Sequence, residues 1–144
     1  MTSPKPFMPT ERQLGDFVGS WTLSRSITPA QGAQARFEGE ARLSRTADGA
    51  AYEEAGVLYL EGAAPMKAER RYRWAEDLSV FFEDGRFFHK VPAKGGRTTH
   101  FCDPDTYTVD YDFSAWPVHT VRWTVKGPRK SYVMVSRYAP VAAP

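Results

Sequence analysis

The sequence has little cysteine, no long apolar run and no concentration of charge of one sign. The single cysteine, Cys102, excludes an internal disulfide. No apolar stretch approaches the roughly 20 residues that cross a bilayer as a helix, so we expect no membrane partner. The 19 basic and 17 acidic residues are spread along the chain and leave a net charge of +2. This distribution gives no sign of nucleic-acid binding.

The motifs of the common enzyme classes are also missing. The sequence contains no Gly-x-Ser-x-Gly, no phosphate-binding loop, no dinucleotide fingerprint and no His-Glu-x-x-His. It therefore gives no support for a hydrolase, kinase or dehydrogenase of these kinds. The first residues lack the apolar run and the cleavage pattern of a signal peptide. Together with the lone cysteine, this predicts a cytoplasmic location.

The sequence is rich in aromatic residues, which make up 14% of the chain and favour strands over helices. From Val18 onward, apolar residues alternate with polar ones almost to the end of the chain. Turn signals such as Asp48-Gly49 and Gly127-Pro128 recur at short intervals and delimit about ten strands. A long meander of short strands usually closes to remove its edges. We therefore predict an all-β fold, a single antiparallel up-and-down β-barrel of about ten strands.

The chain is long enough for one core and too short for two ordinary domains. We expect a barrel domain over residues 10–140, preceded by a flexible lead (1–9) and followed by a tail (141–144). Thr10-Glu11-Arg12-Gln13 matches a capping box and predicts a short helix before Gly19.

The faces of the strands are set by alternation within each strand and by pairing across the turns. The predicted inward face is more polar than an ordinary core. It includes Arg25, Glu54, Arg70, Tyr72, His89, His100, Cys102, Tyr107, Tyr111, His119 and Tyr132. Buried charges need partners, so one interpretation is a structural network in which the two arginines neutralise Glu54 and tyrosine hydroxyls complete the hydrogen bonds.

A functional interpretation is a ligand site. Two guanidinium groups among tyrosines can bind a carboxylate or phosphate through paired hydrogen bonds, and a barrel of this size can enclose a small molecule. We expect the protein to bind a small, anionic, partly apolar organic ligand, with no cofactor. The expected contacts are Arg25, Glu54, Arg70, Tyr72, Tyr107, Tyr111, Trp123 and Tyr132.

The histidines suggest an alternative, a small barrel enzyme. A two-residue turn at Asp84-Gly85 would pair Val80 with His89 and Phe82 with Phe87. A symmetric loop over 92–97 would then pair His89 with His100, and a turn at Pro104-Asp105 would pair Cys102 with Tyr107. Paired histidines could act as general acid and base, so His89 and His100 are the candidate catalytic residues. Metal binding by these two histidines and Cys102 is less favoured.

Short motifs add a resemblance to known families. GDFVGSWTLSR resembles the Gly-x-Trp opening of lipocalins and fatty-acid-binding proteins. This resemblance implies that Trp21 closes one end of a calycin barrel and that Arg137 packs over it. A haem-binding barrel of the nitrobindin type is a further analogy, with His119 as the candidate haem ligand.

Longer segments resemble an uncharacterised bacterial family, the domain of unknown function number 6314. They are GSWTLSR, YEEAG, RRYRW, FEDGRFFHK, HFCDPDTYTVDYDF and VKGPRKSY. The resemblance spans 14–138 and implies the barrel but no activity. A homodimer is compatible with the sequence.

Overall fold

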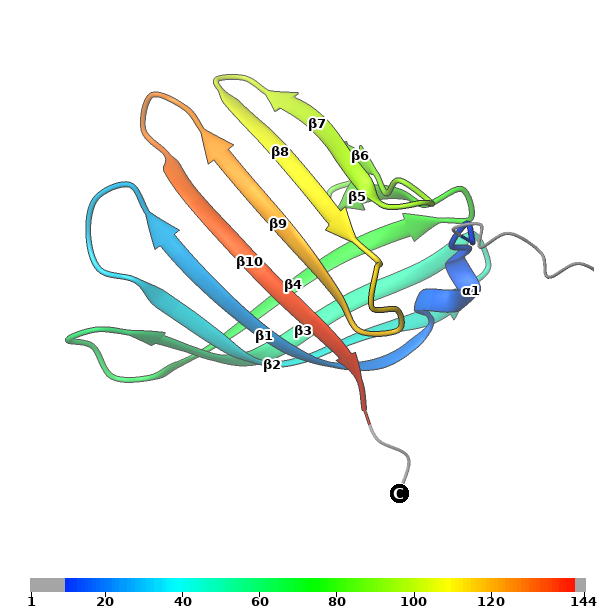
Figure 1. Ribbon diagram of the computed structural model, residues 1–144, viewed down its shortest axis with the longest axis horizontal. Helices are drawn as coiled ribbons and strands as arrows, with labels where there is room; N and C mark the ends of the chain where they lie inside the picture. The colour runs from blue at the N-terminus through cyan, green and yellow to red at the C-terminus, as the bar shows by residue number, and fades with distance from the viewer. Residues whose placement is uncertain (1–9, 142–144) are drawn as a thin grey trace, which may run out of the picture.

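A computed structural model describes residues 10–141, so the predicted lead (1–9) and residues 142–144 lie outside the described part of the chain. A one-turn helix precedes ten strands (Figure 1). The elements are α1 (Leu14–Phe17), β1 (Gly19–Pro29), β2 (Ala35–Thr46), β3 (Gly49–Leu60), β4 (Met66–Ala75), β5 (Ser79–Phe82), β6 (Phe87–Lys90), β7 (Gly96–Cys102), β8 (Asp105–Asp112), β9 (His119–Lys126) and β10 (Ser131–Pro140). No helix within residues 10–141 is long and apolar enough to cross a membrane.

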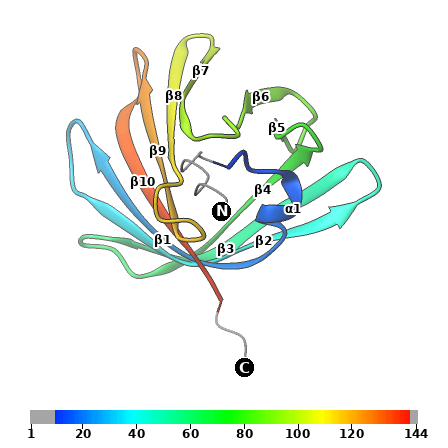
Figure 2. The ribbon, with the colours of Figure 1, turned by 45° about the vertical axis from the view of Figure 1, so that its right-hand side comes forward.

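The strands form one antiparallel sheet in the order β6-β5-β4-β3-β2-β1-β10-β9-β8-β7. Strands that follow each other in the chain are neighbours in the sheet, except for β6 and β7. The first strand, β1, pairs with β2 on one side and with the last strand, β10, on the other. The sheet curls until its two edge strands, β6 and β7, approach each other (Figure 2). No backbone ladder joins them within the described residues. The predicted all-β, ten-stranded up-and-down barrel is confirmed, with a seam between β6 and β7.

Regular hairpins place the predicted residues on the inner face. In β1, exposed residues alternate with buried Trp21, Leu23 and Arg25. Across β2 and β3, Ala41 pairs with Glu54 as the symmetric turn predicts. In β9 and β10, Val125 pairs with Tyr132, which was predicted to face inward. Alternation is reliable here because tight turns fix the register.

The helix closes one end of the barrel. Leu14 and Phe17 of α1 are buried, and the indole N–H of Trp21 donates to the Phe17 carbonyl at 2.8 Å. Trp116 packs edge-on against both Phe17 and Trp21. Trp21 therefore lies at the closed end of the barrel, as the family resemblance implies.

Two expectations at this end are wrong. The capping box begins at Gln13 and uses Asp16, so the predicted box from Thr10 to Gln13 is displaced by three residues. Arg137 is exposed and pairs with Ser24, a residue on the outer face of β1. Because side chains alternate along a strand, Arg137 cannot pack over the inward Trp21.

A β-bulge changes the predicted register of β5 and β6. Val80 pairs with His89 as predicted, but the register then shifts, so Phe81 rather than Phe82 pairs with Phe87. As a result Phe87 is exposed, whereas Phe88 and His89 are both buried. An extra residue in one strand breaks alternation, which is why the inward position predicted for Phe87 is wrong.

The predicted pairing of His89 with His100 is also wrong. His89 lies on β6 and His100 on β7, and these are the two strands that no ladder joins within residues 10–141. His100 pairs with Tyr107, and Cys102 pairs with Asp105, because the turn at Asp103-Pro104 is tighter than expected. A shift of two residues preserves the face, so His100 and Tyr107 still share one.

Candidate functional site

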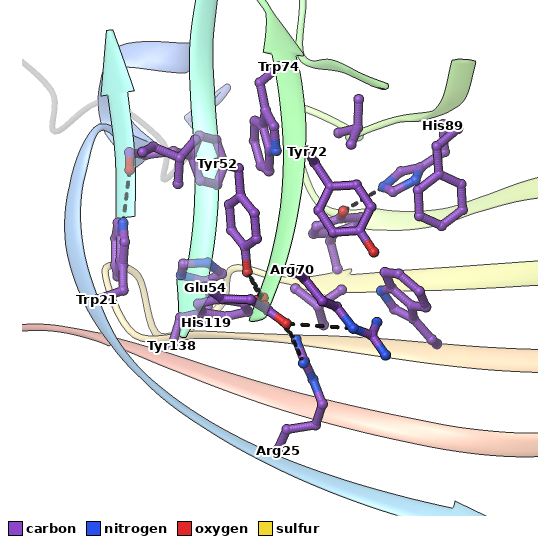
Figure 3. Close-up of a pocket in the computed structure, with 17 residues that line it drawn as sticks. Trp21, Arg25, Tyr52, Glu54, Arg70, Tyr72, Trp74, His89, His119 and Tyr138 are labelled. Atoms are coloured by element: carbon purple, nitrogen blue, oxygen red, sulfur yellow. Dashed lines mark hydrogen bonds and ion pairs between the residues drawn. The ribbon is translucent and has the colours of Figure 1, made fainter. Parts of the chain in front are cut away.

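The barrel encloses a cavity of about 50 Å³ between the closed end and the middle strands (Figure 3). Its polar lining comes from Arg25, Glu54, Arg70, His89 and His119, and its aromatic lining from Phe17, Trp21, Tyr52, Tyr72, Trp74, Phe88, Tyr111, Trp123 and Tyr138. Ordinary ligand pockets measure about 300–1,000 Å³. The enclosed space therefore holds a few waters or a compact chemical group.

Arg25 and Glu54 form a two-pronged buried ion pair. The Arg25 Nη1 and Nη2 atoms donate to the two Glu54 carboxylate oxygens at 2.6 and 3.0 Å, and Arg25 Nε donates to the Ser136 hydroxyl at 2.7 Å. Burial opposes both charges, but the hydrogen bonds outweigh it, so the Arg25 pKa rises and the Glu54 pKa falls. Both groups are held in their charged forms.

Two tyrosines complete this network. Tyr52 donates its hydroxyl hydrogen to Glu54 at 2.6 Å. Since that hydrogen is used, the 2.9 Å contact between Tyr52 and Tyr138 requires Tyr138 to donate to Tyr52. Burial raises the pKa of both tyrosines. Glu54 therefore accepts three hydrogen bonds from its neighbours.

Arg70 is the second arginine of the cavity and is much less constrained. Its Nε lies 3.9 Å from the nearer Glu54 oxygen, and 39% of its side chain is exposed. Its guanidinium lies over the Trp123 ring at 5.8 Å from the centroid. No hydrogen bond to a carboxylate is present at Arg70 within residues 10–141. Arg70 thus retains donor capacity at the wall of the cavity.

His89 and Tyr111 form a separate buried pair. The His89 Nε2 atom and the Tyr111 hydroxyl are 2.7 Å apart. Burial, aided by nearby His100, lowers the His89 pKa to about 4, and burial raises the Tyr111 pKa well above its ordinary value. The pair is therefore neutral at neutral pH. The other ring nitrogen, Nδ1, is buried and has no hydrogen-bond partner within the described residues.

His119 is held in a stack of aromatic rings. Its Nδ1 lies 2.9 Å from the Pro117 carbonyl, and since a carbonyl only accepts, Nδ1 carries the proton. Tyr138 and Trp116 stack on the imidazole at centroid distances of 5.0 Å. Burial lowers its pKa, against the effect of the Pro117 carbonyl. The two stacked rings fix the orientation of the imidazole.

The cavity brings together six of the eight predicted ligand contacts: Arg25, Glu54, Arg70, Tyr72, Tyr111 and Trp123. Tyr107 and Tyr132 are half-buried and do not line it. Of the two candidate catalytic residues, His89 lines the cavity and His100 does not. Phe88 packs against both of these histidine rings, with centroids 4.2 and 5.6 Å away.

Sequence reasoning assigned no site role to Tyr52, Tyr138 or Phe88. The two tyrosines were identifiable, because alternation places Tyr52 on the face of Glu54 and Tyr138 on the face of Tyr132, two residues that were predicted to face inward. Phe88 was not, because only the bulge in β5 and β6 turns it inward. In the part of the chain that the structure describes, no three His, Cys, Asp or Glu side chains are grouped to hold a metal ion.

Comparisons with known proteins place the chain in a family. A family model described as "Family of unknown function (DUF6314)" matches residues 17–140, so the chain belongs to this family. The comparison with curated proteins finds no match. The barrel is similar to the structure of an S-type phycobiliprotein lyase from Guillardia theta, with a TM-score of 0.61 and 10% identity over 91% of this chain and 92% of that chain. At this identity the likeness concerns the fold.

Proposed function

We propose that this member of the family binds a small, anionic, partly apolar organic molecule inside the barrel, with Arg70 holding the anionic group. The observation that carries the proposal is the position of Arg70. It lies at the cavity wall, and Glu54, the acid that lines the cavity, is already bound to Arg25. A planar guanidinium with unused donors is suited to a carboxylate or phosphate.

The charge balance of the cavity supports an anion. Its ionised groups are Arg25, Arg70 and Glu54, which sum to one positive charge. The lining histidines have lowered pKa values and the lining tyrosines raised ones, so all are neutral at neutral pH. Arg25 and Glu54 neutralise each other, so the excess positive charge lies on Arg70, which is partly exposed and can still pair with an anion. A ligand with one negative charge provides the pairing.

The size and walls of the cavity support a compact, partly apolar ligand. About 50 Å³ accommodates a head group of a few atoms. The half-exposed Arg70 lies beside the aromatic surfaces of Tyr72 and Trp123, which offer an apolar wall for the remainder of the molecule.

The acid–base alternative now depends on His89 and Tyr111, because His89 and His100 are not paired across strands. At neutral pH a general acid or base works best when its pKa lies near 7. The His89 pKa of about 4 and the raised Tyr111 pKa are far from that value on either side. We therefore favour binding over catalysis by this pair.

Arg70→Met and a matched control test the proposal. Arg71 lies next to Arg70 on β4, but it is exposed on the outer face beside Glu53 and Glu69. Titration with butyrate, followed by amide NMR, is expected to show saturable shifts in cavity residues of the wild type and of Arg71→Met. Arg70→Met is expected to lose these shifts while it keeps a folded spectrum. Equal binding by all three proteins would refute the assignment of Arg70.

A further inference from the structure

We propose that the cavity selects a hydroxylated carboxylate, in which His89 Nδ1 hydrogen-bonds a neutral hydroxyl group while Arg70 holds the carboxylate. This inference rests on the proposed function and extends it from anions in general to a substrate class. It starts from a buried polar atom for which the fold itself provides no partner within residues 10–141.

The unpartnered atom is His89 Nδ1. The side chain is 3% exposed, and its other nitrogen is engaged by Tyr111 at 2.7 Å. Within the described part of the chain, Nδ1 is the one buried side-chain nitrogen or oxygen without a hydrogen-bond partner. Buried polar groups in folded proteins are almost always satisfied, and an unsatisfied one is destabilising. Because His89 lines the cavity, a ligand bound there is the partner that we propose for Nδ1.

The electrostatics of His89 define what that partner is. A pKa of about 4 means that the ring carries no charge at neutral pH, so it offers little attraction to an anion. Either neutral tautomer leaves Nδ1 able to make one hydrogen bond, as donor or as acceptor. A hydroxyl group can meet both cases because it donates and accepts. A neutral hydroxyl is therefore a better match than a second carboxylate.

The positions of Arg70 and His89 on different strands define how the polar groups of the proposed ligand are spaced. Arg70 lies on β4 and His89 on β6, with the short strand β5 between them. Tyr72 and Phe88 contribute aromatic rings to the wall, their centroids 6.2 Å apart. A molecule that contacts both polar groups thus has a carboxylate and a hydroxyl separated by an apolar section. The cavity volume of about 50 Å³ favours a short chain.

Butyrate and its 2-, 3- and 4-hydroxy derivatives are matched probes for this selectivity. We expect at least one hydroxybutyrate to bind the wild type about tenfold more tightly than butyrate, the usual effect of satisfying a buried polar group. His89→Phe is expected to reduce that preference to about one while it still binds butyrate. Arg70→Met is expected to lose affinity for all four probes.

A nitrogen NMR measurement on the wild type avoids any effect of substitution on folding. The His89 Nδ1 resonance is expected to shift when the preferred hydroxybutyrate binds and to stay in place with butyrate. Binding of butyrate with no hydroxyl preference, or a preference that survives in His89→Phe, would overturn the inference and leave the proposed function intact. Failure of the wild type to bind any of the four would refute the proposed function and this inference with it.

Discussion

Arg25 and Glu54 illustrate how a buried charge is tolerated in this barrel. Each Glu54 carboxylate oxygen accepts from Arg25, Tyr52 donates a further hydrogen bond to Glu54, and Ser136 accepts from Arg25 Nε. Removing one member of such a pair costs more than the pair itself contributes, because the other charge is left buried and alone. The pair is a structural unit rather than a reserve of ligand-binding groups.

A buried pair of this kind predicts a strong asymmetry between single and double substitutions. Arg25→Met is expected to lower the free energy of unfolding by about 3–5 kcal/mol, because Glu54 loses both of its strong donors. Adding Glu54→Gln is expected to recover much of this loss, since the uncompensated charge is then absent. Denaturant unfolding of the two variants and the wild type measures both effects. A loss below about 1 kcal/mol for Arg25→Met would show that the pair is not buried as described.

His89 predicts a specific pH dependence of stability. Its pKa is 6.5 when unfolded and about 4 when folded, so between these values the unfolded state binds more protons. Stability then rises with pH across this window, by about 1.4 kcal/mol per pH unit from this residue, and is unaffected by it above 6.5. His89→Gln is expected to remove this part of the slope. Unfolding curves at pH 5 and pH 7 for both proteins test it, and parallel slopes would contradict the neutral, buried histidine.

At the level of single residues, the sequence predicted positions better than roles. Alternation was sufficient to predict that Arg25, Glu54 and Arg70 face inward, because the residues on the opposite face of each strand are clearly polar. It could not distinguish the paired arginine from the available one. That distinction depends on distances across three strands, 2.6 Å for Arg25 against 3.9 Å for Arg70, and periodicity within a strand contains no such information.

Among the elements, β6 is the least supported by its neighbours. It has four residues, pairs only with β5 among the described strands and faces β7 without a ladder. Its place in the fold depends on Phe88, which is fully buried and packs against Tyr107 of β8 and Trp123 of β9. Phe88 thus bridges the seam, together with the contact of Phe87 with His100 and the hydrogen bond between His89 and Tyr111.

Phe88→Ala and Phe87→Ala are neighbouring substitutions with contrasting predictions. Phe88→Ala is expected to destabilise the protein by about 3–5 kcal/mol, because it leaves a cavity among several rings. Phe87 is 49% exposed, so Phe87→Ala is expected to cost at most about 1 kcal/mol. Denaturant unfolding compares the two. Equal losses would mean that the bulge does not orient β6 as described.

Hydrogen exchange tests the seam itself. Amides of β2 and β3, which have ladders on both sides, are expected to exchange much more slowly than those of β6. If β6 amides were as protected as those of β3, a ladder between β6 and β7 would be indicated in solution.

The elements that sequence reasoning misplaced are those next to this seam. β1 to β4 and β9 to β10 have the predicted faces because symmetric hairpins carry the register from strand to strand. The bulge between Val80 and Phe81 has no signature in the local composition, and it reverses the face of the residues beyond it. The loop from β6 to β7 joins the two edge strands of the sheet, and these strands do not form a hairpin. Assuming a symmetric hairpin there gave the incorrect pairing of His89 with His100.

For the whole molecule, the closed end and the partly exposed Arg70 suggest the direction from which the proposed ligand would approach. Helix α1, Trp21 and Trp116 fill the closed end, whereas Arg70 is in contact with both the cavity and solvent. The Arg70 side chain therefore carries an available positive charge, lines the cavity and is partly exposed to solvent. The proposed function rests on this coincidence.

Binding of an anion by Arg70 inside the barrel is tested most directly by a crystal structure of the protein with saturating butyrate. We expect density for the carboxylate inside the barrel, with its oxygens at about 2.7–3.0 Å from the Arg70 guanidinium and with the Arg25–Glu54 pair unchanged. An interior that holds only water at saturating butyrate, with Arg70 turned to solvent, would contradict the proposed function.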